Sequence, residues 1–220
     1  MTAIDAIGAP SARRNLPAAT AAKVAASEEE IASFVSAHGA GATLLCSGQD
    51  AVMVDLVLGV APKLEVTFID TGYHFPETIE TMLSIVERYR PKLRVVNPWR
   101  HLTGVGKPGF CCSDHKVEQL DLALEGRTAW MSGIRRADGE ARADASLRET
   151  DRRGLAKLNP IVDWDDDDVV AFEVSQDIII NPLRAKGYPS IGCKPCTSPS
   201  TSGRDGRWAG SGKSECGIHL

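Results

Sequence analysis

The sequence predicts an α/β fold, a doubly wound and mostly parallel sheet flanked by helices. Two observations support this prediction. Short apolar runs typical of buried strands alternate with segments of helical periodicity through the middle of the chain. These runs end in turns rich in small and polar residues, and parallel sheets bind their ligands at the carboxyl ends of the strands. We therefore expect the functional site at that edge of the sheet.

Five apolar runs are predicted as strands. The first, ATLLC, is uninterrupted and reads as a strand buried on both faces. The predicted strands are residues 42–46, 63–72, 92–98, 128–134 and the start of 157–177.

Helices are predicted around these strands. Ser27 and Glu30 have the spacing of a capping box, so a helix is expected to begin at Ser27 and to cover 27–38. Pro76 stands in the first turn of a predicted helix. The other helical segments are 51–60, 76–89, 114–125 and the later part of 157–177.

Two charged segments are interpreted as structural features, one as a loop and one as the start of a helix. Residues 135–153 contain six arginines with acidic residues interspersed, and a mobile loop or lid is predicted there. Four consecutive aspartates at 165–168 could suggest a metal site. Acidic side chains are also stabilised near a helix N-terminus by the helix dipole, and this second interpretation is preferred.

Composition indicates an ordinary globular protein. The chain has 220 residues, with 43% hydrophobic and 25% charged residues and a net charge of −4. The negative charge argues against nucleic-acid binding, and no apolar run is long enough to span a membrane. The start of the chain lacks the apolar core of a signal peptide, so a cytoplasmic, reducing location is expected. A transit peptide is the weaker alternative.

We expect three parts along the chain. Residues 1–26 are predicted to be a disordered tail, residues 27–197 a single domain, and residues 198–220 a mobile C-terminal tail.

Four of the six cysteines form two pairs. Cys111 and Cys112 are adjacent, and a disulfide between neighbours would be strained. Cys193 and Cys196 have C-x-x-C spacing, which serves zinc, iron–sulfur clusters and redox dithiols about equally. Together the pairs supply four thiolates, enough for one iron–sulfur cluster or a zinc site. The adjacent pair fits zinc poorly, so a cluster is favoured and zinc stays open.

The remaining two cysteines differ in their surroundings. Cys46 closes an apolar strand and is expected to behave as a small buried hydrophobe. Cys216 lies among small and polar residues near the C-terminus, which makes it a candidate nucleophile or an idle surface thiol. Arg204 and Arg207, shortly upstream, have the character of a clamp for an anion and favour the nucleophile.

The turn CSGQD, residues 46–50, lies between a predicted strand and a predicted helix. Backbone N–H groups at such a place suit a phosphate or a nucleotide. The turn is not a P-loop, so the motif alone is weak evidence.

Several segments in order resemble the adenylylsulfate/phosphoadenylylsulfate reductase family, whose fold is described as adenine nucleotide alpha-hydrolase-like. The resemblance extends from about residue 42 to the C-terminus. The segments are CSGQDAVMVDL, FIDTGYHFPET, CCSDHKVEQL, AWMSGIRR, NPLRAKGYPSIGCKPCT, RDGRW and ECGIHL.

The resemblance implies a reaction. Cys216 would attack the sulfate sulfur of adenylylsulfate (APS) to give S-sulfocysteine and AMP, and reduced thioredoxin would then release sulfite. It also implies a homo-oligomer. Family members that use APS generally carry both cysteine pairs and a [4Fe–4S] cluster, so Cys111, Cys112, Cys193 and Cys196 are the expected cluster ligands.

The resemblance further implies a substrate-binding set drawn from several turns and from the C-terminal region. Its members here are Ser47, Gly48, Asp50, Asp70, Thr71, Gly72, Lys116, Gly133, Arg142, Arg204, Arg207 and His219.

Three other readings stay open. The nearest is a reductase for the 3′-phosphorylated nucleotide (PAPS) that works by the same mechanism. The second is a non-redox PP-loop nucleotide-binding protein of the same fold, which leaves the ECGIHL segment unexplained. The third is a Cys₄ metal-binding module without catalysis.

Overall fold

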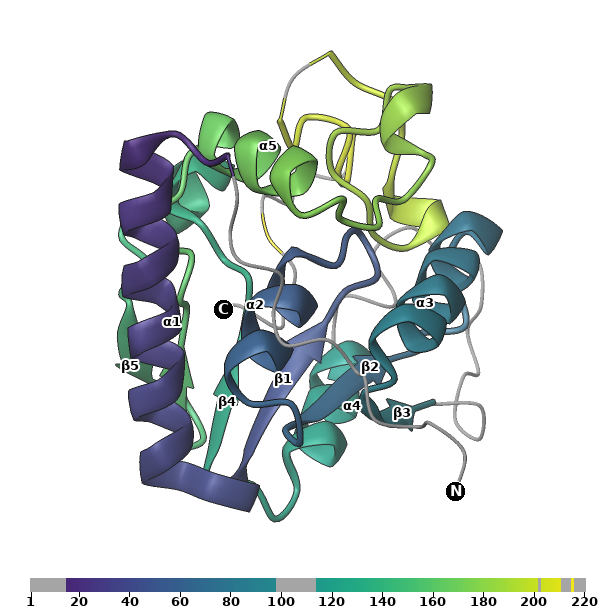
Figure 1. The fold of residues 1–220 in the computed structure, drawn as a ribbon. Helices are drawn as coiled ribbons and strands as arrows, with labels where there is room; N and C mark the ends of the chain where they lie inside the picture. Colours follow the sequence, from purple (N-terminus) through teal and green to yellow (C-terminus); the bar gives the residue numbers. More distant parts are fainter. Residues whose placement is uncertain (1–14, 98–113, 202, 211–214, 216–220) are drawn as a thin grey trace, which may run out of the picture.

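The computed structural model describes residues 15–97, 114–201, 203–210 and 215, which build one twisted sheet with helices on both faces (Figure 1). The described strands have the spatial order β3-β2-β1-β4-β6-β5. Their bounds are β1 Ala42–Cys46, β2 Glu65–Ile69, β3 Lys92–Val96, β4 Ala129–Met131, β5 Arg148–Thr150 and β6 Ala156–Leu158. The predicted strands are confirmed, with shorter bounds for several of them.

The sheet is parallel except at one edge. Strands β1 to β4 and β6 pair in parallel, whereas β5 pairs antiparallel with β6. The chain moves from β1 outward to β2 and β3, and then returns to place β4 on the other side of β1. The strand order therefore reverses between β1 and β4, and the loops that follow them diverge there. Open α/β sheets bind their ligands at this switch point.

Helices cover the two faces unequally. Helix α4 (Asp114–Leu124) packs on one face beneath β2 and β3. The other face carries a layer of four helices that contact one another through α2. These helices are α1 Ala18–His38, α2 Val52–Val60, α3 Pro76–Tyr89 and α5 Asp166–Ser175.

Side-chain alternation along the strands builds both cores. In β1, Leu44 joins the larger core on the side of α2, while Leu45 packs against the core on the side of α4. In β4, Met131 faces the larger core and Trp130 the smaller one. Each large apolar side chain buried in this way contributes about 1.5–3 kcal/mol to folding. The central strands are thus stabilised from both sides, and this fixes the loops at their ends.

Helix α1 begins at Ala18, directly after Pro17, so its predicted start at Ser27 is wrong. Ser27 is buried inside the helix, where its hydroxyl donates to the carbonyl of Pro160 at 2.6 Å and accepts from Trp164 Nε1 at 3.1 Å. The preceding alanines have high helix propensity and extend the helix toward the N-terminus. The predicted disordered tail of residues 1–26 is therefore wrong for 18–26, while residues 1–14 lie outside the described residues.

The predicted lid at 135–153 is replaced by an ordered connection. It contains two short 3₁₀ turns, Arg136–Asp138 and Glu140–Arg142, and then strand β5. Strand β5 is short and polar, with no apolar alternation in the sequence, and pairing with β6 is what forms it.

The aspartate run caps a helix, as expected. Asp165 is the N-cap of α5, and its side chain accepts from the backbone N–H of Asp168 at 2.9 Å. Among the described residues, no helix is both long enough and apolar enough to cross a membrane.

Residues 198–201 and 203–210 pack back onto the domain. Thr197 and Arg207 form an antiparallel bridge, and the backbone N–H of Trp208 donates to the carbonyl of Cys196 at 2.9 Å. Trp208 is buried. The expected boundary at residue 197 therefore does not mark the end of the packed chain.

Candidate active site

The loop after β1 leaves the sheet at the switch point between β1 and β4. Gly48 has φ +69°, and a Cβ there would lie 3.0 Å from both Met82 Cγ and Thr78 Cγ2. Only glycine fits both constraints. Asp50 accepts from the backbone N–H of Val52 at 3.1 Å, and burial raises the pKa of its carboxyl. Exposed Ser47 completes this loop.

Cys46 is held as a neutral thiol at the end of β1. Burial raises the pKa of its thiol to about 12, and its Sγ lies 3.7 Å from Met82 Sδ. A thiol with this pKa is protonated at neutral pH and is a poor nucleophile or ligand. Its predicted role as a small apolar side chain agrees with this environment.

The loop after β2 forms a tight turn at the neighbouring position. Asp70 accepts from the backbone N–H of Gly72 at 2.9 Å and from Asn97 Nδ2 at 3.0 Å. Gly72 has φ +70°. The hydroxyl of buried Thr71 lies 3.3 Å from Cys193 Sγ, so this turn is in direct contact with the C-x-x-C segment.

Cys193 directly precedes the 3₁₀ turn Lys194–Cys196, and the side chains of Cys193 and Cys196 are both buried. The backbone N–H of Lys194 donates to the carbonyl of Tyr73 at 2.7 Å, which fixes this turn against the β2 loop. The pair can supply two thiolates to a metal group. Cys111 and Cys112, the other expected ligands, lie outside the described residues, and within those residues no group of three or more possible ligands is assembled.

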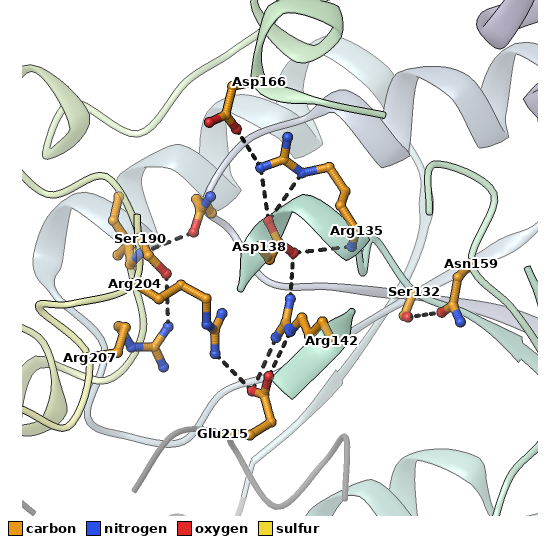
Figure 2. A network of polar contacts seen from close by, with 12 residues as sticks. Ser132, Arg135, Asp138, Arg142, Asn159, Asp166, Ser190, Arg204, Arg207 and Glu215 are labelled. Carbon is orange, nitrogen blue, oxygen red and sulfur yellow. Dashed lines mark hydrogen bonds and ion pairs between the residues drawn. The ribbon is translucent and has the colours of Figure 1, made fainter. Parts of the chain in front are cut away.

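A cluster of arginines and carboxylates lies beside these loops (Figure 2). Arg142 donates through Nε and Nη2 to Glu215 at 2.6 and 3.1 Å, and through Nη1 to Asp138 at 2.7 Å. Arg204 donates to the same Glu215 carboxylate at 2.8 Å. Asp138 also accepts from Arg135 Nη2 at 2.8 Å. One carboxylate of the C-terminal region therefore joins two arginines that are distant in sequence.

The electrostatic environments of these two arginines differ. Burial lowers the pKa of Arg142, but its bonds to Glu215 and Asp138 outweigh burial and leave the pKa above its ordinary value. Burial, together with the positive charge of Arg142, lowers the pKa of Arg204 to about 10. Both guanidinium groups are protonated at neutral pH, so the cluster can bind an anion.

Arg207 is oriented by an aromatic ring and a glycine. Its guanidinium carbon lies 4.4 Å from the centre of the Trp208 ring, and Nη1 donates to Ser190 Oγ at 3.4 Å. A Cβ on Gly192 would lie 2.2 Å from Arg207 Nη2, so the guanidinium passes directly over this glycine. Its Nε is buried and has no hydrogen-bond partner among the described residues. Arg207 therefore has a buried donor available to a ligand.

The last two described members of the expected substrate set lie at the same edge of the sheet. Gly133 follows β4, where a Cβ would lie 2.9 Å from Met53 Cγ at the start of α2. Half-buried Lys116 lies in the first turn of α4, which begins at the carboxyl edge because it connects parallel strands. Cys216 and His219 lie outside the described residues.

The family of the chain follows from a match to a known domain. Residues 42–199 match the model of the phosphoadenosine phosphosulfate reductase domain. The chain belongs to this family. A reductase-family relative from Mycolicibacterium smegmatis, named adenosine 5′-phosphosulfate reductase, is 42% identical over 223 residues, covering 94% of each chain.

Two solved structures share the fold of this reductase-family chain. Phosphoadenylyl-sulfate (PAPS) reductase from Candida auris, in a phosphate complex, matches with a TM-score of 0.61 at 22% identity, covering 80% of this chain and 92% of that one. FMN adenylyltransferase from Candida glabrata matches with a TM-score of 0.68 at 18% identity, covering 84% and 67%. The predicted fold class, a mostly parallel sheet of the adenine nucleotide alpha-hydrolase-like type, is confirmed.

Four residues beside these arginines were not predicted as part of the site. Asp138 and Arg135 orient Arg142, and Trp208 lies under Arg207. The ion pairs of Asp138 with Arg135 and Arg142 span three and four residues, so they are local contacts within one connection. Glu215 was also missed, although its place directly before Cys216 was a signal in the sequence.

Proposed function

We propose that the protein is an assimilatory adenylylsulfate reductase. The single observation that carries the proposal is the carboxylate of Glu215, which is bound by Arg142 and Arg204. Cys216, the proposed nucleophile, follows Glu215 directly in the sequence. Relatives named adenosine 5′-phosphosulfate reductase, 41–43% identical to this chain, support the same substrate.

In the first step, the Cys216 thiolate attacks the sulfur of the sulfate group. A bond forms between Cys216 Sγ and that sulfur, and the bond from sulfur to the bridging phosphate oxygen breaks. AMP leaves with the electron pair, and S-sulfocysteine remains on the protein. A thiolate is a strong nucleophile near neutral pH, and a phosphate is a good leaving group.

In the second step, a reduced dithiol protein, thioredoxin, attacks Cys216 Sγ. The bond to the sulfonate breaks, and sulfite leaves with the electron pair. The second thiol of thioredoxin then displaces Cys216 from the mixed disulfide, so the dithiol is oxidised to a disulfide while the sulfate sulfur is reduced to sulfite. The Cys216 thiol is regenerated.

Arginines offset the charge of the reacting anion. Arg142, Arg204 and Arg207 would bind the phosphosulfate, with Lys116 and His219 as further contacts. Pre-oriented cations in a site with little water stabilise developing negative charge strongly. The loops after β1, β2 and β4 would hold the nucleotide through Ser47, Gly48, Asp50, Asp70, Thr71, Gly72 and Gly133.

A [4Fe–4S] cluster would be held by Cys193 and Cys196 together with Cys111 and Cys112. Two buried cysteines beside the nucleotide loops fit half of this ligand set. When bound, such a cluster would add to the charges beside the substrate.

The function is tested by sulfite release under anaerobic conditions with reduced thioredoxin. APS and PAPS are offered in parallel. A preference for APS supports the proposal, and a preference for PAPS supports the alternative reductase. Sulfite from neither nucleotide would contradict both and favour a non-redox nucleotide-binding protein. Replacing Cys216 by Ser should abolish sulfite release.

The cofactor is tested by iron and sulfide content. Cys193→Ser and Cys196→Ser should each lose most of the iron because a thiolate ligand is removed. Cys46→Ser is the matched control, since its half-buried thiol has a pKa of about 12 and stays protonated, and it should keep the iron. Iron retained by Cys193→Ser would contradict this ligand assignment.

Location and assembly follow from the same function. A thiolate nucleophile and a thioredoxin reductant fit the reducing conditions of the cytoplasm. Assembly into a homo-oligomer is checked by light scattering of the purified protein.

A further inference from the structure

The loop after β1 is bound by the segment that leads to the C-x-x-C pair. The backbone N–H of Asn181 donates to the carbonyl of Gln49 at 3.1 Å, and Asn181 Nδ2 donates to the carbonyl of Gly48 at 3.3 Å. Asn181 is completely buried, and its Oδ1 accepts from the backbone N–H of Leu183 at 3.0 Å. The main chain of the loop is therefore fixed by a segment that lies far away in the sequence.

Gln49 binds the other end of the same segment. Its side-chain Oε1 accepts from the backbone N–H of Ile191 at 3.0 Å, and the side chain of Ile191 is buried. A backbone N–H that loses its acceptor inside a protein costs free energy, so this bond holds the main chain at Ile191 against the loop. Gln49 itself lies between Gly48 and Asp50, two residues that the proposed function assigns to the nucleotide.

The main chain that follows Ile191 supports Arg207. Gly192 donates its backbone N–H to Thr197 Oγ1 at 3.2 Å, and Thr197 forms an antiparallel bridge with Arg207. The Arg207 guanidinium passes directly over Gly192. A shift of the main chain at residues 191–192 would therefore move the surface on which this guanidinium lies.

We infer that Gln49 is a positioning residue, whose side chain fixes the main chain under Arg207 relative to the nucleotide loop and so aligns the guanidinium with a bound nucleotide. The inference rests on the proposed function, because it takes the loop after β1 and Arg207 as parts of one nucleotide site. It assigns Gln49 no proton transfer and no contact with the reacting atoms. Its effect is on nucleotide affinity, since charge-assisted hydrogen bonds to a phosphate depend on distance and angle.

A purely structural role for Gln49 has a different signature. If its side chain only stabilised the loop, its removal and the removal of the Arg207 guanidinium would weaken nucleotide binding independently. Arg207→Ala would then have the same cost whether Gln49 is present or not. A positioning role instead makes the cost of Arg207→Ala depend on the residue at position 49.

The test measures AMP affinity by calorimetry, with and without Arg207→Ala, in the full-length protein with its cofactor. In the wild type, Arg207→Ala should lower AMP affinity roughly 10- to 100-fold, because hydrogen bonds to a charged ligand are lost. Gln49→Met keeps the length of the side chain but removes the amide. In that background Arg207→Ala should cost less than about 3-fold, and an equal cost in both backgrounds would overturn the inference.

Two further backgrounds separate the hydrogen bond from other effects. Gln49→Glu keeps an oxygen that accepts from Ile191, so Arg207→Ala should cost as much as in the wild type. The added charge acts on AMP with and without Arg207→Ala, so the comparison removes its effect. Gln176→Met is the matched control, with the same exchange at the C-cap of α5, where the amide donates to Ser175 Oγ at 3.0 Å. A reduced cost of Arg207→Ala in either background would overturn the inference.

The remaining outcomes separate the two proposals. Arg207→Ala without effect in the wild type would remove the premise of the inference and overturn it. If Gln49→Met does not fold, as judged by thermal unfolding, Gln49→Asn takes its place with the same expectation, because its shorter amide does not reach Ile191. Sulfite release from APS with equal costs in all backgrounds overturns only the inference. The expected costs without sulfite from either nucleotide support the role of Gln49 in nucleotide binding and contradict the reductase function.

Discussion

Glycine residues at the site serve different physical purposes. Gly48 and Gly72 both have positive φ. Only at Gly48 would an added Cβ also come close to neighbouring side chains. Gly192 needs no unusual dihedral angle and instead leaves space for a guanidinium. The three positions can therefore be distinguished by the same substitution to alanine.

Gly48→Ala should destabilise the protein more than Gly72→Ala. Positive φ alone costs an alanine about 1–2 kcal/mol, and the 3.0 Å approach to Met82 and Thr78 adds an overpacking cost of about 1–3 kcal/mol at Gly48. Gly72, with no atom within 4 Å of the added Cβ, is the matched control. Urea unfolding measures both, and equal losses of unfolding free energy would contradict the packing argument.

Gly192→Ala should weaken nucleotide binding through Arg207. The added methyl must displace the guanidinium, whose hydrogen bonds to a charged ligand contribute about 1.5–3 kcal/mol, so AMP affinity should fall roughly 10- to 100-fold. Arg207→Ala should have a similar effect. The double variant is the control: if both act through one guanidinium, its loss is far less than the sum. Additive losses would show that Gly192 acts independently.

At the scale of elements, a local sequence pattern determines where helix α5 begins. Helix α5 begins with a capping box in which Asp165 and Asp168 each accept from the other's backbone N–H. The acidic run is therefore a helix start, and it also supplies Asp166 to Arg135 in the arginine cluster.

Asp165→Ala should cost about 0.5–2 kcal/mol of unfolding free energy because the backbone N–H of Asp168 loses its acceptor. Asp167→Ala is the matched control, since this exposed residue in the same turn contributes only through the helix dipole. Denaturant unfolding compares them, and equal losses would mean that charge alone accounts for the effect.

At the scale of the whole molecule, side-chain contacts join helix α1 to helix α5. Lys23 and Thr20 of α1 bind Asp168 of α5, with Thr20 Oγ1 donating at 2.8 Å. These contacts join the beginning of the described chain to a segment more than a hundred residues later. Because they depend on the carboxylate of Asp168, the contact between α1 and α5 is sensitive to acid.

The pH dependence follows from the environment of Asp168. Burial raises the pKa of this carboxyl, but hydrogen bonds from Lys23 and Thr20 outweigh burial and leave the pKa below its ordinary value. A carboxyl with a lower pKa in the folded state stabilises the protein above the unfolded-state value of about 3.9. That stabilisation is lost as the pH falls through the folded-state value.

Asp168→Asn should therefore be less stable than wild type at neutral pH and should lose less stability on acidification. Urea unfolding at several pH values between about 6 and 3 measures this, with Asp167→Asn as the control. A wild-type acid dependence in Asp168→Asn would show that another carboxyl is responsible.

The sequence by itself determined the alternation of strands and helices, the family and the residues of the turns. Strands such as ATLLC could be predicted because a strand buried on both faces is continuously apolar. Helix α5 could be predicted from its acidic first turn, and Cys46 as an apolar side chain from its position. These are local properties, in which composition and conformation are directly linked.

Only the tertiary structure decided the rest. Strand β5 is polar and forms through pairing with β6, and Ser27 lies inside α1, not at its start, where its hydroxyl binds Pro160 of a distant loop. The cluster of Arg142, Arg204 and Glu215 draws on segments more than sixty residues apart, as the separation of Arg142 from Glu215 shows. No local pattern encodes which carboxylate meets which guanidinium, because that choice is made by the packing of the whole chain.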